Sequence, residues 1–162
     1  MQVTCFFLSL LIACSTHAFW QKAPITELRL IPIKTDGVAT QAICDHLINT
    51  TQNSNASVTI TIDPNDESIS INQALTISLA FFLNDGKTIF YIFAQPNQKH
   101  VSELERLLIQ KNIPMLRLHD VPYRPIQPYG SHNAFAIEIQ TSKKNMAESI
   151  EVLQTYIESL IS

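Results

Sequence analysis

Residues 74–94 read ALTISLAFFLNDGKTIFYIFA, and this stretch decides which fold the sequence predicts. From Leu75 to Leu83 large apolar residues alternate with small or polar ones. A period of two is typical of a strand with one buried face. A helix over residues 72–84 is the alternative, since a glycine follows that could end it. The alternation favours the strand.

A turn and a second apolar run follow. Asp85 and Gly86 separate the two runs, and an Asp-Gly pair in this position predicts a β-hairpin over residues 75–94. The returning run, 88–94, is apolar on both faces. We therefore expect it to lie centrally in the sheet and to be covered on each side. If the hairpin stays uncovered, another chain could bury it, which predicts an oligomer interface there.

Two further stretches predict strands nearer the N-terminus. Residues 58–63 (VTITID) and 68–72 (SISIN) both alternate, and the polar turn between them predicts a second hairpin. Residues 25–34 (ITELRLIPIK) predict an earlier strand. Pro32 lacks the N–H that a central strand donates, so we expect this strand at an edge or bulged.

Amphipathic stripes predict three helices. Apolar residues recur every three or four positions in 38–50, in 101–111 and in 146–160. Residues 115–120 and 133–140 predict two strands. The sum is a single α+β domain, residues 19–162, in which a largely antiparallel sheet of about five to seven strands, with two hairpins, packs on three helices.

The first 18 residues, MQVTCFFLSLLIACSTHA, predict a signal peptide. They hold no charged side chain, and an apolar run too short to span a bilayer precedes small residues ending at Ala18. Residues 11–14 (LIAC) resemble the bacterial lipobox, which gives lipidation of Cys14 as a second export route. A buried first element is the alternative to export. The predicted location is periplasmic or secreted, or the outer membrane for a lipoprotein.

Composition excludes several chemistries. The net charge is −3 with scattered Lys and Arg, which argues against nucleic-acid binding and against a polybasic membrane binder. No segment after the predicted signal is long and apolar enough for a transmembrane helix. Removal of residues 1–18 leaves Cys44 alone, which excludes an internal disulfide and a cysteine-based zinc site; we expect a buried, inert thiol. Only three glycines occur, far apart, so no nucleotide-binding loop can form.

The stretch 121–132 (VPYRPIQPYGSH) differs in composition from the rest of the chain. Prolines stiffen it, and Tyr123, Arg124 and Tyr129 are residue types that anchor interfaces. Long connections without secondary structure often bind something. The first functional prediction is therefore a non-enzymatic binding or accessory protein, whose partner is a protein or a small-molecule ligand. A rigid connector is the alternative for this loop.

Four residues near predicted strand ends suggest a second function. They are His119, Asp120, His132 and Glu138. Two histidines and a carboxylate can hold a catalytic zinc ion and leave a position for water, so the alternative prediction is a small zinc hydrolase that uses His119, His132 and a carboxylate. No compact metal-binding motif accompanies them, and Glu138 lies within a predicted strand.

Overall fold

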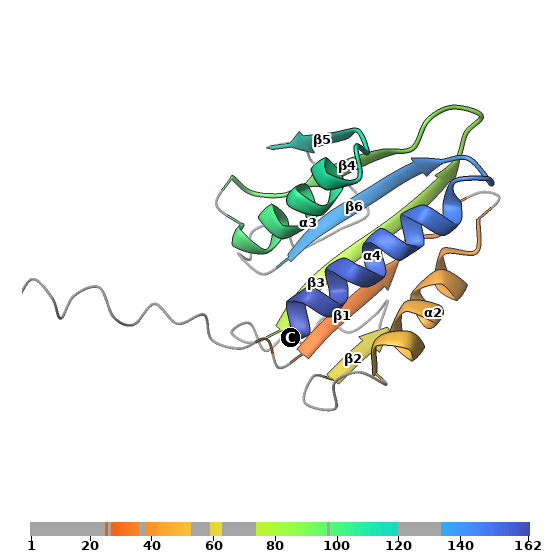
Figure 1. Cartoon of the computed structure of the whole chain (residues 1–162). Coiled ribbons are helices and arrows are strands. Elements are labelled where there is room, and N and C mark those ends of the chain that lie inside the picture. The colour runs from red at the N-terminus through yellow and green to blue at the C-terminus, as the bar shows by residue number, and fades with distance from the viewer. Residues whose placement is uncertain are drawn as a thin grey trace, which may run out of the picture.

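A computed structural model of the chain describes residues 25, 27–35, 38–52, 59–62, 74–96, 98–119 and 134–162. This part contains one six-stranded sheet and three helices (Figure 1). In chain order the elements are β1 (Glu27–Pro32), α2 (Thr40–Gln52), β2 (Thr59–Ile62), β3 (Ala74–Leu83), β4 (Ile89–Phe93), α3 (Lys99–Gln110), β5 (Met115–Leu118), β6 (Ala134–Thr141) and α4 (Met146–Ile161). The predicted signal peptide, with Cys14, lies outside the described residues.

The sheet is mostly parallel, which corrects the predicted fold class. Its strand order is β2-β1-β3-β6-β4-β5. Only β4 and β6 pair in antiparallel fashion; the other four neighbouring pairs are parallel. Two units, β1-α2-β2 and β4-α3-β5, have the strand–helix–strand order that parallel pairing requires. The fold is therefore α/β, and the prediction of a largely antiparallel α+β sheet was wrong.

The predicted hairpin over residues 75–94 does not form, although both of its strands do. β3 is a strand, as the alternation predicted, but it pairs with β6 and not with β4. β6 lies between them, and the N–H of Asn84, just after β3, donates to the carbonyl of Thr141 at the end of β6 (2.9 Å). The Asp-Gly turn reverses the direction of the chain, but the two strands that it connects, β3 and β4, are not neighbours in the sheet. β4 is paired on both edges, as its apolar composition indicated.

Of the other predicted hairpin, the structure describes only the first strand, β2. β2 pairs with β1 in parallel, and β1 separates it from β3. Residues 68–72, its predicted second strand, lie outside the described part. β1 itself is an interior strand, contrary to the expectation for Pro32. Pro32 is tolerated because it is the last residue of β1, beyond the stretch that pairs with β2 (Glu27 to Leu30).

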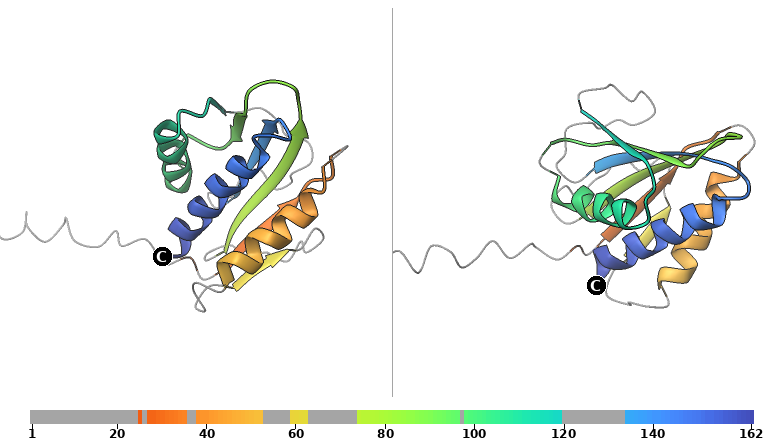
Figure 2. Two further views of the ribbon diagram at one scale, coloured as in Figure 1. Left: turned by 45° about the vertical axis from the view of Figure 1, so that its right-hand side comes forward. Right: turned by 45° about the horizontal axis from the view of Figure 1, so that its top comes forward.

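All three described helices lie on one face of the sheet, with α4 between α2 and α3 (Figure 2). In α3 the buried residues are Val101, Leu104, Leu107 and Leu108, the four that the predicted stripe turns inward. Leu153 and Ile157 of the α4 stripe are buried as well. These side chains meet those of the central strands, such as Phe81 and Ile137, and form the main core.

The Cys44 thiol is part of this core. It is 0% exposed on α2, and burial, with the Asp45 carboxylate as a smaller cause, raises its pKa to about 12. The neighbouring Asp45 and His46 are exposed, so the three side chains do not converge. This confirms the predicted buried cysteine, and a thiol with so high a pKa is inert as a nucleophile.

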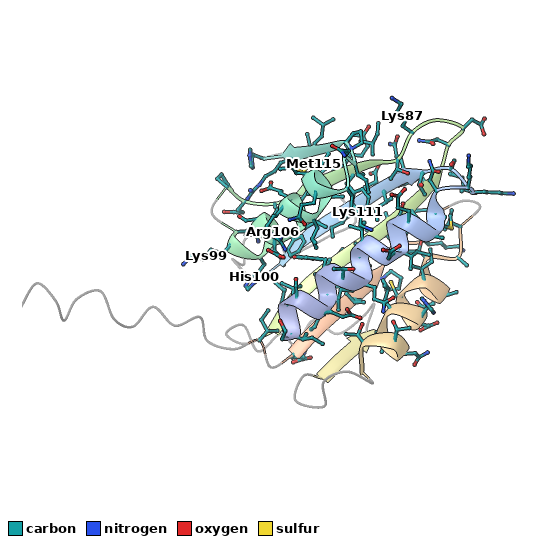
Figure 3. The ribbon with its side chains drawn as sticks, viewed as in Figure 1. Lys87, Lys99, His100, Arg106, Lys111 and Met115 are labelled. Atoms are coloured by element: carbon teal, nitrogen blue, oxygen red, sulfur yellow. The ribbon has the colours of Figure 1, made fainter. Side chains whose placement is uncertain are left out.

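Two polar contacts join α4 to α3. Lys111, just after α3, donates through Nζ to Glu151 Oε1 of α4 (2.9 Å), and both side chains are exposed (Figure 3). Tyr156 of α4 is 0% exposed, and its hydroxyl donates to the carbonyl of His100 in the first turn of α3 (3.1 Å). Exposed ion pairs stabilise a fold little, so the buried tyrosine contact is the stronger connection.

Tyr156→Phe should lower the free energy of unfolding by about 1 kcal/mol, because it leaves the His100 carbonyl without this buried donor. Urea denaturation would measure the change. Tyr91→Phe on β4 is the matched control, since the Tyr91 side chain is only partly buried and no hydrogen bond of its hydroxyl is seen within the described residues. Equal losses in the two variants would contradict this role of Tyr156.

Among the described helices, none is both long and apolar enough to cross a membrane.

Candidate functional site

The described helices cover one face of the sheet and leave the other (Figure 2). Glu138 lies on β6, near the middle of the sheet. Successive residues of a strand point to opposite faces, so Ile137 and Ile139 enter the core under the helices while Glu138 points the other way. Its register partners are Ala80 on β3 and Tyr91 on β4. This partly buried carboxylate, between small and aromatic side chains on a central strand, is the candidate functional group of this face.

The carboxylate is oriented by its own strand. Gln140, two residues on and therefore on the same face, donates through Nε2 to Glu138 Oε1 (3.1 Å). Both side chains are partly buried. Tyr91 stands directly opposite Glu138 in the antiparallel pair, where side chains are about 5 Å apart at Cβ. Tyr91 and Glu138 are therefore neighbours on the same face of the sheet.

Ser78 adds a polar group to the same face. It precedes Ala80 by two residues on β3, and its register partner on β6 is Ala136. Ser78 is 0% exposed, and its Oγ has no hydrogen-bond partner among the described residues. Buried polar atoms without partners are rare in folded proteins and call for an explanation. Ala80 and Ala136, which neighbour Glu138 and Ser78 on this face, are buried as well.

His119 does not lie near Glu138 in the structure. It follows β5, in which Arg117 points towards α3 and donates through a terminal NH2 group to Glu105 (3.1 Å). Strand alternation places His119 on that same side of the sheet, opposite to Glu138. Its Nδ1 lies 3.0 Å from the carbonyl oxygen of Ala94 and donates to it when protonated. The described structure therefore separates two of the four predicted site residues.

The other predicted site residues lie outside the described part. They are Asp120 and His132, the remaining metal-ligand candidates, and Tyr123, Arg124 and Tyr129 of the predicted binding loop. Within the described residues, no three His, Cys, Asp or Glu side chains are close enough to hold a metal ion. A zinc site made of these residues alone does not fit, because zinc needs at least three protein ligands.

The sequence singled out Glu138 but missed its partners. Ala80, Tyr91 and Ser78 belong to the stretch interpreted as a hairpin, and that pairing would have put β6 elsewhere. The signal that could have found Gln140 was its spacing of two from Glu138 on one strand. Nothing local could have found Tyr91, because its proximity depends on β4 pairing with β6.

Comparisons with known proteins concern the fold. No protein-family model matches the chain, and no curated protein sequence matches it. The chain is similar to a solved bacteriophage poly-gamma-glutamate hydrolase (TM-score 0.50, 10% identity, covering 83% of each chain). It is similar to zinc-free YndL (TM-score 0.50, 12% identity, 81% of this chain and 84% of that one).

A third solved structure has the same degree of similarity. It is the catalytic domain of CwlV, an N-acetylmuramoyl-L-alanine amidase from Bacillus (Paenibacillus) polymyxa var. colistinus (TM-score 0.50, 10% identity, 83% of this chain and 93% of that one). At such identities the likeness shows a shared α/β fold and leaves the chemistry to the site itself.

Proposed function

We propose that this protein is an exported hydrolase of amide bonds in which Glu138 is the catalytic carboxylate. The observation that carries the proposal is the position of Glu138: a partly buried carboxylate on a central strand, on the face away from the described helices, opposite Tyr91. The fold supports it, since similar structures include a poly-gamma-glutamate hydrolase and an N-acetylmuramoyl-L-alanine amidase. Both names describe enzymes that break amide linkages. Export rests on the predicted signal peptide, residues 1–18.

The arrangement suits general acid–base catalysis. Glu138 accepts a proton from water as the water oxygen attacks the amide carbonyl, and it then returns the proton to the leaving amine. Gln140 holds one carboxylate oxygen, so the orientation is set before substrate arrives. Tyr91 can donate a hydrogen bond to the carbonyl oxygen as negative charge develops there.

The first functional prediction, a non-enzymatic binding protein that uses the loop 121–132, receives no support from the described structure. Its three anchor residues lie outside the described part, and the similar folds with named activities are hydrolases. A fold alone does not exclude binding without catalysis. The assay below therefore distinguishes the two functions.

Incubation of the purified chain with poly-γ-glutamate, and separately with an N-acetylmuramoyl peptide, should release new amino groups from one of the two. A fluorogenic amine reagent measures the release. Heat-denatured protein is the control for spontaneous hydrolysis. No release from either substrate above that control would contradict the proposed function.

Elemental analysis of the same preparation tests the zinc prediction, which depends on Asp120 and His132. About one zinc ion per chain, lost together with activity in His132→Ala, would support a zinc site that includes residues outside the described part. Activity in protein with less than about a tenth of a zinc ion per chain would exclude zinc from the reaction, since a catalytic zinc is needed in every active molecule.

A further inference from the structure

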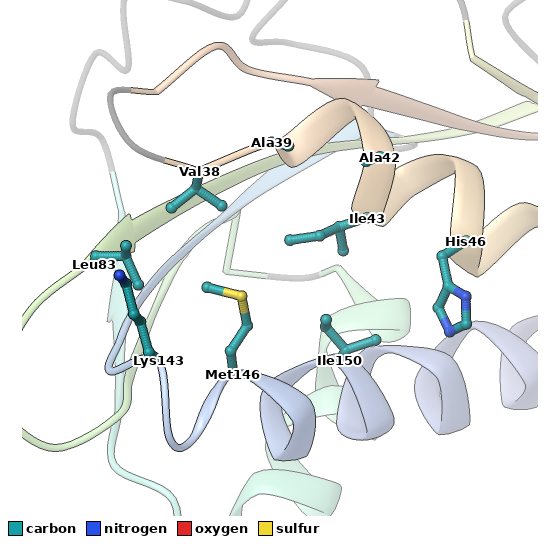
Figure 4. Close-up of a pocket in the computed structure, with 9 residues that line it drawn as sticks. All are labelled: Val38, Ala39, Ala42, Ile43, His46, Leu83, Lys143, Met146 and Ile150. Atoms are coloured by element: carbon teal, nitrogen blue, oxygen red, sulfur yellow. The ribbon is translucent and has the colours of Figure 1, made fainter.

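An apolar trough lies on the helix side of the sheet, between the start of α2 and the first turns of α4. Its cavity volume is about 350 Å³, and it opens beside Leu83, the last residue of β3 (Figure 4). It is separate from Glu138, which lies on the other face. Cavities of this size, lined mainly by apolar side chains with few polar groups, are typical small-molecule sites.

The trough stays open because one wall has short side chains. Ala39 and Ala42, at the beginning of α2, face Met146 and Ile150, which are one turn apart on α4 (Figure 4). Larger residues at the two alanines would close the space, as Ile43 does farther in, where it is 8% exposed. The trough runs between two helices and is therefore suited to an unbranched apolar chain.

Positive charge marks one end of the trough. Lys143, in the turn between β6 and α4, extends towards Leu83, and His46 lies at the other end (Figure 4). Lys143 is exposed, and it makes no ion pair with any described residue. The positive end of the α4 dipole lies nearby and adds to the field.

Among the described residues that line the trough, none is a carboxylate that would cancel this charge. Glu148 is two residues from both Met146 and Ile150, so it points away on the helix, about 200° from each. The hydrogen bond to Glu151, the charge of Glu151 and, least, the charge of Glu148 raise the pKa of the exposed Lys111, just after α3. Asp45 precedes His46 but accepts a hydrogen bond from Gln41 (3.3 Å) on the exposed side of α2.

We propose that this trough binds a single-chain carboxylate amphiphile, a fatty acid of medium length, whose chain lies between α2 and α4 and whose carboxylate pairs with Lys143. The apolar walls favour the alkyl chain of the ligand, and Lys143 favours its negatively charged carboxylate. The site is independent of the proposed hydrolase function, because it uses none of the residues around Glu138.

Isothermal titration calorimetry with decanoate, below its micelle concentration, tests the proposal. We expect one site per chain, and affinity that rises about fourfold per methylene from octanoate to decanoate. Lys143→Ala should weaken decanoate about fivefold and leave 1-decanol unchanged. Lys144→Ala is the matched control, since Lys144 is the exposed neighbour that does not line the trough. Ala42→Phe should remove binding of both ligands, with an unchanged far-UV circular dichroism spectrum.

Three results would overturn the proposal: no binding of decanoate by the folded wild type, equal losses in Lys143→Ala and Lys144→Ala, or decyltrimethylammonium binding as well as decanoate does. Glu138→Gln should bind decanoate like the wild type. An inactive protein that still binds decanoate would contradict the hydrolase proposal alone, and an active one that does not bind it would contradict the trough alone.

Discussion

Glu138→Gln should lower the rate of amide hydrolysis by about 10²–10⁴-fold, the range that positioned general acid–base groups contribute. Glutamine keeps the size of the side chain but cannot take a proton from water. The strand should be unaffected, because Glu138 is not part of the core under the helices. This is the largest effect on function that we predict for a single substitution.

Two measurements make the result specific. Thermal unfolding should give nearly the same melting temperature for Glu138→Gln and wild type. Glu148→Gln, the same change at an exposed position on α4, is the matched control and should keep full activity. If Glu138→Gln retained more than about a tenth of the wild-type rate, Glu138 could not be the group that handles the proton.

Phe81→Ala should have the largest effect on stability, a loss of about 3–5 kcal/mol in the free energy of unfolding. Phe81 is 0% exposed on β3 and belongs to the main core. Removing its ring leaves a cavity between the sheet and the helices. Single domains are stable by only about 5–15 kcal/mol, so this one change removes a large share.

Phe82→Ala provides the matched control. Phe82 is the next residue, is 36% exposed and points to the opposite face of the sheet. Its loss should cost about 1 kcal/mol or less, which urea denaturation of the two variants would show. Similar losses in both variants would contradict the placement of the two faces, and with it the side on which we locate Glu138.

The oligomer interface predicted for residues 75–94 stays a prediction, although the hairpin on which it rested does not form. That prediction required a hairpin with an uncovered apolar face. β3 and β4 each pair with β6 instead, and their residues Leu79, Phe90 and Ile92 are 0–1% exposed within one chain. Little apolar surface of these core residues is therefore left for a second chain.

The sequence by itself determined the type and extent of most elements. Alternation from Leu75 to Leu83 predicted a strand against a helix, and the stripe of α3 predicted its four buried residues. These signals are local: side chains repeat every two positions in a strand and about every 3.6 in a helix, whatever lies beside them. For the same reason the sequence marked Glu138 as a carboxylate within an apolar strand.

Only the tertiary structure decided which strands are neighbours, and hence what surrounds Glu138. β4 is apolar on both faces, so it could pair with any strand that buries it. The short turn at Asp85-Gly86 favoured pairing of β4 with β3, yet β6, some 50 residues later, lies between them. Runs of that kind, with helices between strands, are typical of parallel sheets, where burial on both faces governs pairing. The periodicity of a strand does not specify which distant strand it pairs with. The pairing of β6 with β3 and β4 places Ala80 and Tyr91 on either side of Glu138.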